Sequence, residues 1–563
     1  MKINELAKII SVGVVLGLTA CGGGGGGGGG SNNGGNTPTV ADADNDTVED
    51  SADNCPNDAN TDQLDSDLDG AGDACDPLPT MYAYSDENGA DTVSFTGQTA
   101  RQVLLTDLVT AMNATSRDAG NVPADVVDDL NYYYSLDAAT RDASYVATFA
   151  LAGGENIIGN DTDAAAPTIA PGAISSDKVV KSKIAGQDSA DHILGGEFFG
   201  WDGYSTPEEL IDGLLAVLGE ESADTTDQIA IAGGSANVGA ATVTESGLDL
   251  RQLIQKVLLG ALNFSQGTAD YLSIDYGSDA NLTLAEGKTY TEGAHDFDEA
   301  FGYFGAARNY NDLTDAEIRD GYLFAASDSI LVDSAIDLRS EFNFANSTNC
   351  AKRDQGTADN TNPTNLTKEI FDAFILGREI LQNAAAGATE TSAGSLSTEA
   401  AEVLDDQIVI AAQTWEKCIA STVVHYINDV LGDMEDFNGD EFADLDNFLN
   451  LAKHWAEMKG FALGLQFSPF SPFRSGEIVV DGEVESVNVD IDDLKQVLSL
   501  MGDAPVLADG TQDTTTDNIE NGSLYAGAAS AADAKAAYIA DLETARDILE
   551  QAYAFDTENV ANW

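Results

Sequence analysis

The chain has 563 residues, of which 96 are acidic and 25 basic, so its formal net charge is −71 at pH 7. A charge this negative excludes nucleic acid and anionic lipid headgroups as partners, because both would be repelled. Since the excess is general, we interpret it as a source of solubility in a saline environment rather than as a binding site.

The first twenty residues predict a targeting segment rather than folded structure. Lys2 and Lys8 flank a short basic region, and the apolar run at 9–18 is too short to span a bilayer as a mature helix. The run ends in LTAC, which resembles the lipobox of bacterial lipoproteins. The resemblance implies cleavage before Cys21, a lipid on its thiol and, because Gly follows, sorting to the outer membrane. A plain secretory signal is the alternative.

Residues 21–40 predict a flexible linker. Nine glycines at 22–30 are followed by SNNGGNTPT. A Gly-rich chain behaves as a random coil, with a reach of about 25 Å for twenty residues. We expect this segment to hold the rest of the chain away from the lipid, on the periplasmic face or at the cell surface.

The segment 41–78 is intensely acidic and predicts calcium sites. It has too few large apolar residues to fold without cations. The pattern D-x-D-x-D-G-x5-D at 65–76 is that of a calcium loop, in which alternate Asp side chains converge on one ion and Gly70 allows the turn. A second loop begins at 42, with Thr47 where Gly is expected, and a third frame overlaps both. The predicted calcium ligands are Asp42, Asp44, Asp46, Asp50, Asp53, Asp58, Asn60, Asp62, Asp65, Asp67, Asp69, Asp73 and Asp76.

The order of these motifs resembles thrombospondin type 3 repeats. DNCP at 53–56, N-x-D-Q at 60–63 and D-x-D-x-D-G-x-G-D-x-C-D at 65–76 follow one another as in that family. The resemblance implies a calcium-wrapped stalk with little regular secondary structure, stapled by a Cys55–Cys75 disulfide worth about 3 kcal/mol. A disordered acidic linker is the alternative.

Two further cysteines, Cys350 and Cys418, lie far along the chain. An export compartment permits them to form a disulfide. Two free buried thiols are the alternative.

Residues 79–563 predict a mostly α-helical region of two packed bundles, because apolar residues recur at three- and four-residue spacing. Long polar loops are expected at 267–293 and 344–366. One minor β hairpin is expected at 476–490, with Asp481 and Gly482 at its turn. The predicted helices cover 98–113, 207–219, 248–264, 295–308, 367–387, 398–431, 443–466 and 531–554.

Two histidines in this region have carboxylates at helical spacing. His295 precedes Asp298 and Glu299, and His454 precedes Glu457, so each set shares one helix face. An imidazole and a carboxylate from each of two facing helices can bind a transition metal such as iron or zinc. A hydrogen-bonded pair at the edge of the core is the alternative for each motif.

The order His-x-x-Glu resembles the G-x-H-x-x-E motif of imelysin-like proteins, which are exported two-bundle helical proteins linked to iron uptake. The segment 293–298 matches with Asp in place of Glu, and 452–457 matches with Ala in place of Gly. The wider segments 295–310 and 453–470 also resemble an uncharacterised family of bacterial surface lipoproteins. These likenesses cover most of 79–563 and imply a domain that binds a metal ion or metal complex.

The other two histidines are expected to be structural. His425 lies in an apolar helical run, although Glu416 or Asp429 can join it to a site. His192 precedes a cluster of aromatic residues typical of packing.

The sequence thus favours a calcium-binding outer-membrane lipoprotein whose helical domain captures a metal, iron above others, for an uptake transporter. A calcium-dependent adhesin or surface-glycan binder with structural His motifs is one alternative, and a metallopeptidase is another. The chain has no H-E-x-x-H, G-x-S-x-G or P-loop motif, so no familiar catalytic pattern marks an enzyme. The sequence leaves the oligomeric state open.

Overall fold

The structure is a computed structural model that describes residues 41–143, 145, 147–151, 153–159, 165–186, 192–321, 335–513 and 523–563. The predicted signal peptide at 1–20, the linker at 21–40 and the lipidated Cys21 lie outside the described residues. The chain forms two compact units. One ends at Leu78 and includes Val479–Glu485, and the other comprises Pro79–Ile478 and Ser486–Trp563.

The acidic segment 41–78 is built from turns and bends, without a helix or strand in that range. The Cys55–Cys75 disulfide is present. Beside it, Asn54 donates hydrogen bonds from its backbone N to Gln63 Oε1 (2.9 Å) and from Nδ2 to Gln63 O (3.0 Å). Gly72 N donates to Asn54 O at 3.2 Å. A disulfide and polar contacts therefore fasten this stalk where a folded domain would have an apolar core.

The prediction of a mostly α-helical region is confirmed, and helix starts follow the expected signals. The helix at 207 begins with Thr206 accepting a hydrogen bond from Glu209 N, and the helix at 398 begins with Ser397 accepting one from Ala400 N. The predicted helices correspond to α1 (Thr96–Ala114), α5 (Pro207–Ala223), α6 (Leu250–Leu258), α7 (Glu292–Phe304), α10 (Leu366–Ala384), α11 (Thr398–Glu435), α12 (Leu445–Gly464) and α15 (Ala531–Tyr553).

One predicted loop is wrong, because 344–366 contains a helix, α9 (Ala345–Thr357). Its sequence, ANSTNCAKRDQGT, is too polar to show an apolar stripe. The helix is nevertheless buried along one side, and the Cys350–Cys418 disulfide joins it to α11. Packing against the rest of the domain, together with this disulfide, therefore stabilises a helix that the local sequence does not favour. Further helices without a prediction are α2 (Pro123–Tyr134), α3 (Ala138–Asp142), α4 (Pro171–Ile174), α8 (Asp315–Arg319), α13 (Pro472–Ser475), α14 (Ile491–Met501) and α16 (Thr557–Asn562).

Helix α6 continues into two π-helical stretches, η5 (Leu259–Phe264) and η6 (Gln266–Tyr271). At Gly260 the backbone approaches α12 so closely that a Cβ would lie 2.5 Å from Gly464 Cα. Only glycine fits at such an approach. The pair lets the two helices pack backbone against backbone.

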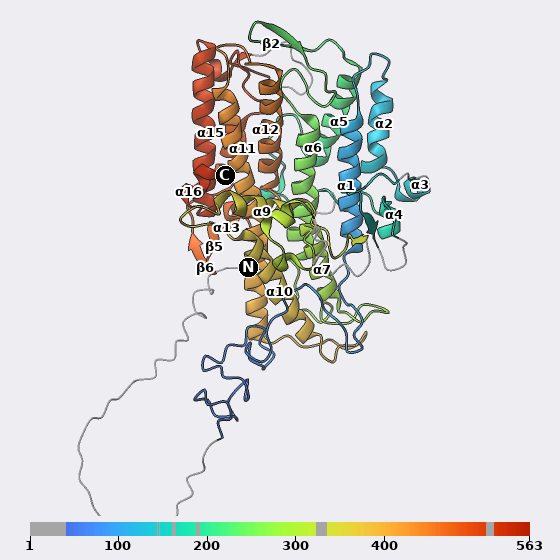
Figure 1. Cartoon of the computed structure of the whole chain (residues 1–563), viewed down its shortest axis with the longest axis vertical. Helices are drawn as coiled ribbons and strands as arrows, with labels where there is room; N and C mark the ends of the chain where they lie inside the picture. Colours follow the sequence, from blue (N-terminus) through green and yellow to red (C-terminus); the bar gives the residue numbers. More distant parts are fainter. Residues whose placement is uncertain are drawn as a thin grey trace, which may run out of the picture. The chain divides into compact units, whose positions relative to one another are not determined.

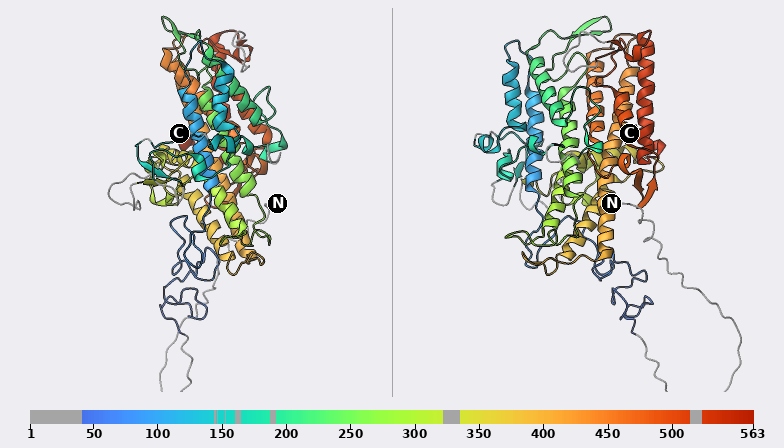
Figure 2. Two further views of the ribbon diagram at one scale, coloured as in Figure 1. Left: turned by 90° about the vertical axis from the view of Figure 1, so that its right-hand side faces the viewer. Right: turned by 180° about the vertical axis from the view of Figure 1, so that it is seen from behind.

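The long helices of the second unit run side by side (Figure 1). Helix α2 packs on α1 and on α5, and α11 packs on α12 and α15 to form a second group. Helix α6 joins the groups, because it packs on α5 and α1 and also on α12. The view from behind in Figure 2 shows the same two groups. Trp415 on α11 and Trp455 on α12 are both fully buried.

The strands are short and paired two by two. The predicted hairpin is formed by β5 (Glu477–Val480) and β6 (Glu483–Ser486), and both turn residues, Asp481 and Gly482, have positive φ (50° and 78°), as a type I′ turn requires. The other pairs are parallel β1 (Asn156–Ile158) with β4 (Ala335–Asp337), and antiparallel β2 (Gln228–Ile231) with β3 (Gly234–Asn237) and β7 (Thr511–Gln512) with β8 (Ser523–Leu524).

Across the described ranges, none of the helices combines the length and apolar character needed to cross a bilayer.

Candidate metal centres

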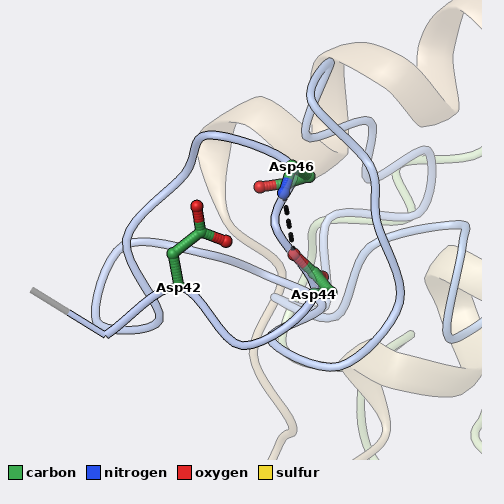
Figure 3. A group of neighbouring side chains, drawn as sticks. All are labelled: Asp42, Asp44 and Asp46. Carbon is green, nitrogen blue, oxygen red and sulfur yellow. Dashed lines mark hydrogen bonds between the residues drawn. The ribbon is translucent and has the colours of Figure 1, made fainter.

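Three aspartates of the first acidic loop bring their carboxylates together. Asp42, Asp44 and Asp46 each place one oxygen within 4.8 Å of those of the other two (Figure 3). Asp44 Oδ1 accepts a hydrogen bond from Asp46 N at 3.2 Å, and Asp46 Oδ1 accepts one from Val48 N at 2.8 Å. These side-chain-to-backbone bonds curl the loop, so that alternate side chains face one centre.

Some carboxylate oxygens in this loop have no hydrogen-bond donor beside them among the described residues. Asp42 Oδ1, Asp44 Oδ2 and Asp53 Oδ2 are buried and accept no hydrogen bond within the described part of the chain. Desolvation, together with the charges of Asp46, Asp53 and Asp42, raises the pKa of the Asp44 carboxyl. A divalent cation would relieve both penalties by supplying positive charge and coordinating the free oxygens. An all-oxygen donor set suits calcium rather than a softer metal.

The second loop repeats the first at an offset of 23 residues, from Asp42 to Asp65. Asp65, Asp67 and Asp69 form a second triad within the same 4.8 Å limit, and Asp65 Oδ1 is again buried without a partner. The turn positions also correspond: Gly70 has φ +101° and Thr47, its counterpart, has φ +85°. The position where the pattern expects glycine is thus left-handed in both loops, and Thr47 carries the strain.

The remaining predicted calcium ligands have other contacts. Asp50 and Asp73 are equivalent, since each accepts a hydrogen bond from the backbone N–H seven residues earlier, at 2.7 Å and 2.8 Å. Asn60 is buried and donates its backbone N–H to Asp46 Oδ2 at 2.9 Å. The exposed members that lie outside both triads are Asp58, Asp62 and Asp76.

Asp298, one of the predicted metal ligands, pairs with protein groups in the core of the helical domain. The carboxylate is fully buried and forms an ion pair with Arg378, Oδ1 to Nε at 2.9 Å. It also accepts hydrogen bonds from Tyr82 OH (2.8 Å) and Ser94 N (3.0 Å). Burial raises the pKa of Asp298, and the Arg378 charge opposes that rise. All its contacts face the core, because α7 buries this side of the helix.

His295 lies on the other side of α7 and has a small set of neighbours. Its Nε2 is 3.7 Å from Glu299 Oε1, and its ring stacks on Tyr290 with centroids 5.1 Å apart. Its Nδ1 is buried and has no hydrogen-bond partner within the described residues. The expected pairing of His295 with Glu299 on one face is therefore present, and the described residues form no group of three candidate ligands around it.

His454, on α12, faces α11 instead. Its Nδ1 lies 2.7 Å from Asp433 Oδ2, and its Nε2 lies 3.8 Å from Asp429 Oδ2. The same Asp429 oxygen is 3.3 Å from His425 Nε2. Burial and the nearby Arg353 lower the pKa of His425 to about 4, despite Asp429. Two imidazoles therefore flank one carboxylate.

Glu457 does not join His454. Its Oε1 is 3.3 Å from Lys256 Nζ, on α6, and its side chain is nearly inaccessible. Across the described residues, groups of three or more candidate ligands with all donor atoms within 4.8 Å of one another are the two aspartate triads. The predicted five-residue site of His295, Asp298, Glu299, His454 and Glu457 is therefore not assembled, because its members point into separate clusters.

The other two histidines, His425 and His192, each lie close to an aspartate. Asp429 does join His425, whereas Glu416 faces Tyr553, whose OH donates to Oε1 at 2.8 Å. His192 is buried, with Nε2 2.7 Å from Asp270 Oδ1, as a packed structural histidine would be.

Asp433 was missed as a partner of His454. A sequence signal existed for part of this cluster, because His425, Asp429 and Asp433 follow at four-residue spacing along one helix face. The pairing of that face with His454 depends on how α11 and α12 pack, which local spacing does not specify.

Comparison with known proteins adds two family matches. The thrombospondin type 3 repeat matches residues 41–63, and a domain of unknown function (DUF4856) matches residues 162–422. The second match includes His295 but ends before His425 and His454. No curated protein and no solved structure matches the chain. The chain is therefore similar to a thrombospondin type 3 repeat in its acidic segment and to the DUF4856 domain in part of its helical region.

Proposed function

We propose that this protein is a lipid-anchored lipoprotein of the bacterial outer membrane, in which a calcium-loaded repeat links a flexible tether to a helical ligand-binding domain. The N-terminal targeting pattern, with Cys21 at its end, supports the anchor. The two disulfides support an oxidising compartment.

The buried free oxygens of the aspartate triads carry the calcium part of this proposal. Asp44 Oδ2 in the first loop and Asp65 Oδ1 in the second are buried and accept no hydrogen bond from any described residue. Calcium prefers such carboxylate oxygens and takes several at once. Bound ions would order a segment that has little apolar surface of its own, and so turn a loose linker into a stalk.

Calcium titration of the full chain by isothermal calorimetry tests this. We expect the Asp44→Asn and Asp67→Asn variants each to lose one tight site. Glu49→Gln is the matched control, because it removes one charge from the same segment at an exposed residue outside the predicted ligands. Full calcium binding in both Asp variants, or equal loss in the control, would show that the triads are not the sites.

Metal capture is the second candidate for the helical domain. It is favoured by the way His425 and His454 approach one Asp429 oxygen from two helices. Imidazole and carboxylate together suit iron or zinc, which an uptake transporter would then receive. Elemental analysis after loading with each metal tests it: the His454→Ala variant should lose the metal while His295→Ala retains it. Metal absent from the wild type, or lost equally from both variants, removes this candidate.

A further inference from the structure

Several basic side chains influence one another in this acidic protein. Among its 25 basic residues, Lys256 on α6 and Arg353 on α9 are close enough to Lys352, also on α9, for their charges to act on it; we call these three the basic cluster. Lys256 pairs with Glu457 at 3.3 Å. Lys453 Nζ lies 3.9 Å from the other oxygen of Glu457 and adds a fourth positive charge at the edge. Such a concentration is unusual in a chain with 96 acids, so it requires a reason.

Arg353 has unfilled hydrogen-bonding capacity. The residue is 7% exposed, and its Nε and Nη1 are buried without a partner among the described residues. Burial lowers the pKa of Arg353 to about 10, although Tyr426 and Asp429 oppose that shift. A buried guanidinium normally has acceptors for its donors, because desolvated donors without partners are costly.

The backbone of Arg353 is held in place. Trp563 Nε1 donates a hydrogen bond to Arg353 O at 3.0 Å. One turn earlier, Cys350 is bonded to Cys418 of α11. The guanidinium is therefore presented by a fixed helix, which reduces the entropy cost of binding an acceptor.

Lys352 is the member of the basic cluster that a ligand can reach from solvent. The residue is exposed, and within the described part of the chain its ammonium group has no hydrogen-bond or ion-pair partner. Surrounding protein atoms, then Lys256 and Arg353, lower its pKa to about 8, while Glu457 acts in the opposite direction. The exposed Lys352 is therefore next in sequence to the buried Arg353, whose donors are unfilled.

We propose that Lys352 and Arg353 bind a small oxyanion, the carboxylate or phosphate group of a ligand held by the helical domain. Arginine offers a planar set of donors that matches such groups, and lysine adds a compact charge. The acidic excess of the chain repels anions elsewhere, so the basic cluster would also select where the anionic end of a ligand binds. This site shares no residue with the calcium repeat and does not depend on it.

Calorimetric titration of the full chain with inorganic phosphate and with succinate, at constant ionic strength in chloride, tests the proposal. Binding of phosphate alone or succinate alone identifies the source of the oxyanion. Lys352→Gln should weaken binding about tenfold or more, since a hydrogen bond to a charged group is lost. Arg353→Gln should abolish it.

Two further measurements keep this test decisive. Lys368→Gln is the matched control, because Lys368 is an exposed helical lysine and the substitution changes the net charge equally. Thermal unfolding identifies an Arg353→Gln protein that fails to fold, in which case Lys352→Gln, at an exposed residue, decides alone. Absence of binding for both anions in the wild type, or the same loss in the Lys352 and Lys368 variants, would overturn the proposal.

Discussion

The acidic repeat and the helical domain treat buried charge in opposite ways. In the repeat, carboxylates converge on one another, and the oxygens of Asp44 and Asp65 are left free. In the helical domain, a buried carboxylate such as Asp298 has its own cation, Arg378, and donors from Tyr82 and Ser94. The repeat depends on positive charge from a cation in solution, whereas the helical domain supplies positive charge from its own arginine. The same residue type is therefore a binding group in one place and a packing group in the other.

Removing calcium should produce the largest difference in behaviour between the two units. We expect chelation to abolish backbone protection across 41–78, because like charges in the triads then repel and little apolar burial opposes them. The helical domain should keep its protection. Hydrogen exchange with mass spectrometry, before and after chelation, measures both in one sample. Equal loss in the two units would end the distinction.

Removing Asp298 should give the largest effect within the helical domain. Asp298→Ala leaves Arg378 buried without its counter-charge, which costs about 3–5 kcal/mol of unfolding free energy. Denaturant unfolding of Asp298→Ala and of the wild type measures this loss of stability. Lys368→Ala, which breaks an exposed pair with Asp372, is the control and should cost less than about 0.5 kcal/mol. A small effect at Asp298 would show that the buried pair is not needed for stability.

The two units should also respond to pH in opposite directions. Burial raises the pKa of Glu416 to about 8 from 4.5, so the folded domain holds a proton that the unfolded chain releases. This contribution is complete below pH 4.5 and is lost as pH rises towards 8, at about 1.4 kcal/mol per pH unit. In the repeat, acid protonates the Asp44 carboxyl, whose pKa is also raised, and calcium binding weakens.

Glu416→Gln isolates the helical half of this prediction. The variant should be more stable than the wild type at pH 8 and similar at pH 5, as measured by denaturant unfolding at both pH values. Glu402→Gln, at an exposed position on the same helix, should show no such difference. A wild type and Glu416→Gln variant with parallel pH profiles would contradict the prediction.

Relieving the strained turn should have the smallest effect. Thr47→Gly removes the cost of a left-handed β-branched residue, about 1 kcal/mol, so calcium should bind the first loop a few times more tightly. Gly70→Ala is the reciprocal change and should weaken the second loop. Calorimetry compares both with the wild type. Unchanged affinity in both would mean that turn strain is not coupled to binding.

The sequence was most informative where chemistry is local. The aspartate spacing, Gly70 and the Asp481-Gly482 turn each impose a conformation within a few residues, and the structure has those conformations. Apolar periodicity likewise predicted the long helices, because one face of each is buried.

Features that depend on distant partners could not be predicted in the same way. Nothing near Asp298 in the chain indicates Arg378, which is 80 residues away. Helix α9 has no apolar stripe and is fastened from outside, through Cys350. The basic cluster was missed for the same reason, since Lys256 and Lys352 are far apart in sequence.

The Cys350–Cys418 disulfide gives assembly of the helical domain an order in time. The two cysteines are 68 residues apart, so α9 cannot be locked until α10 and the first half of α11 have been synthesised and folded against it. The bond also requires an oxidant. Until it forms, α9 has only a weakly helical sequence and its packing contacts to hold it, so the side chains of that helix reach their final places late in folding.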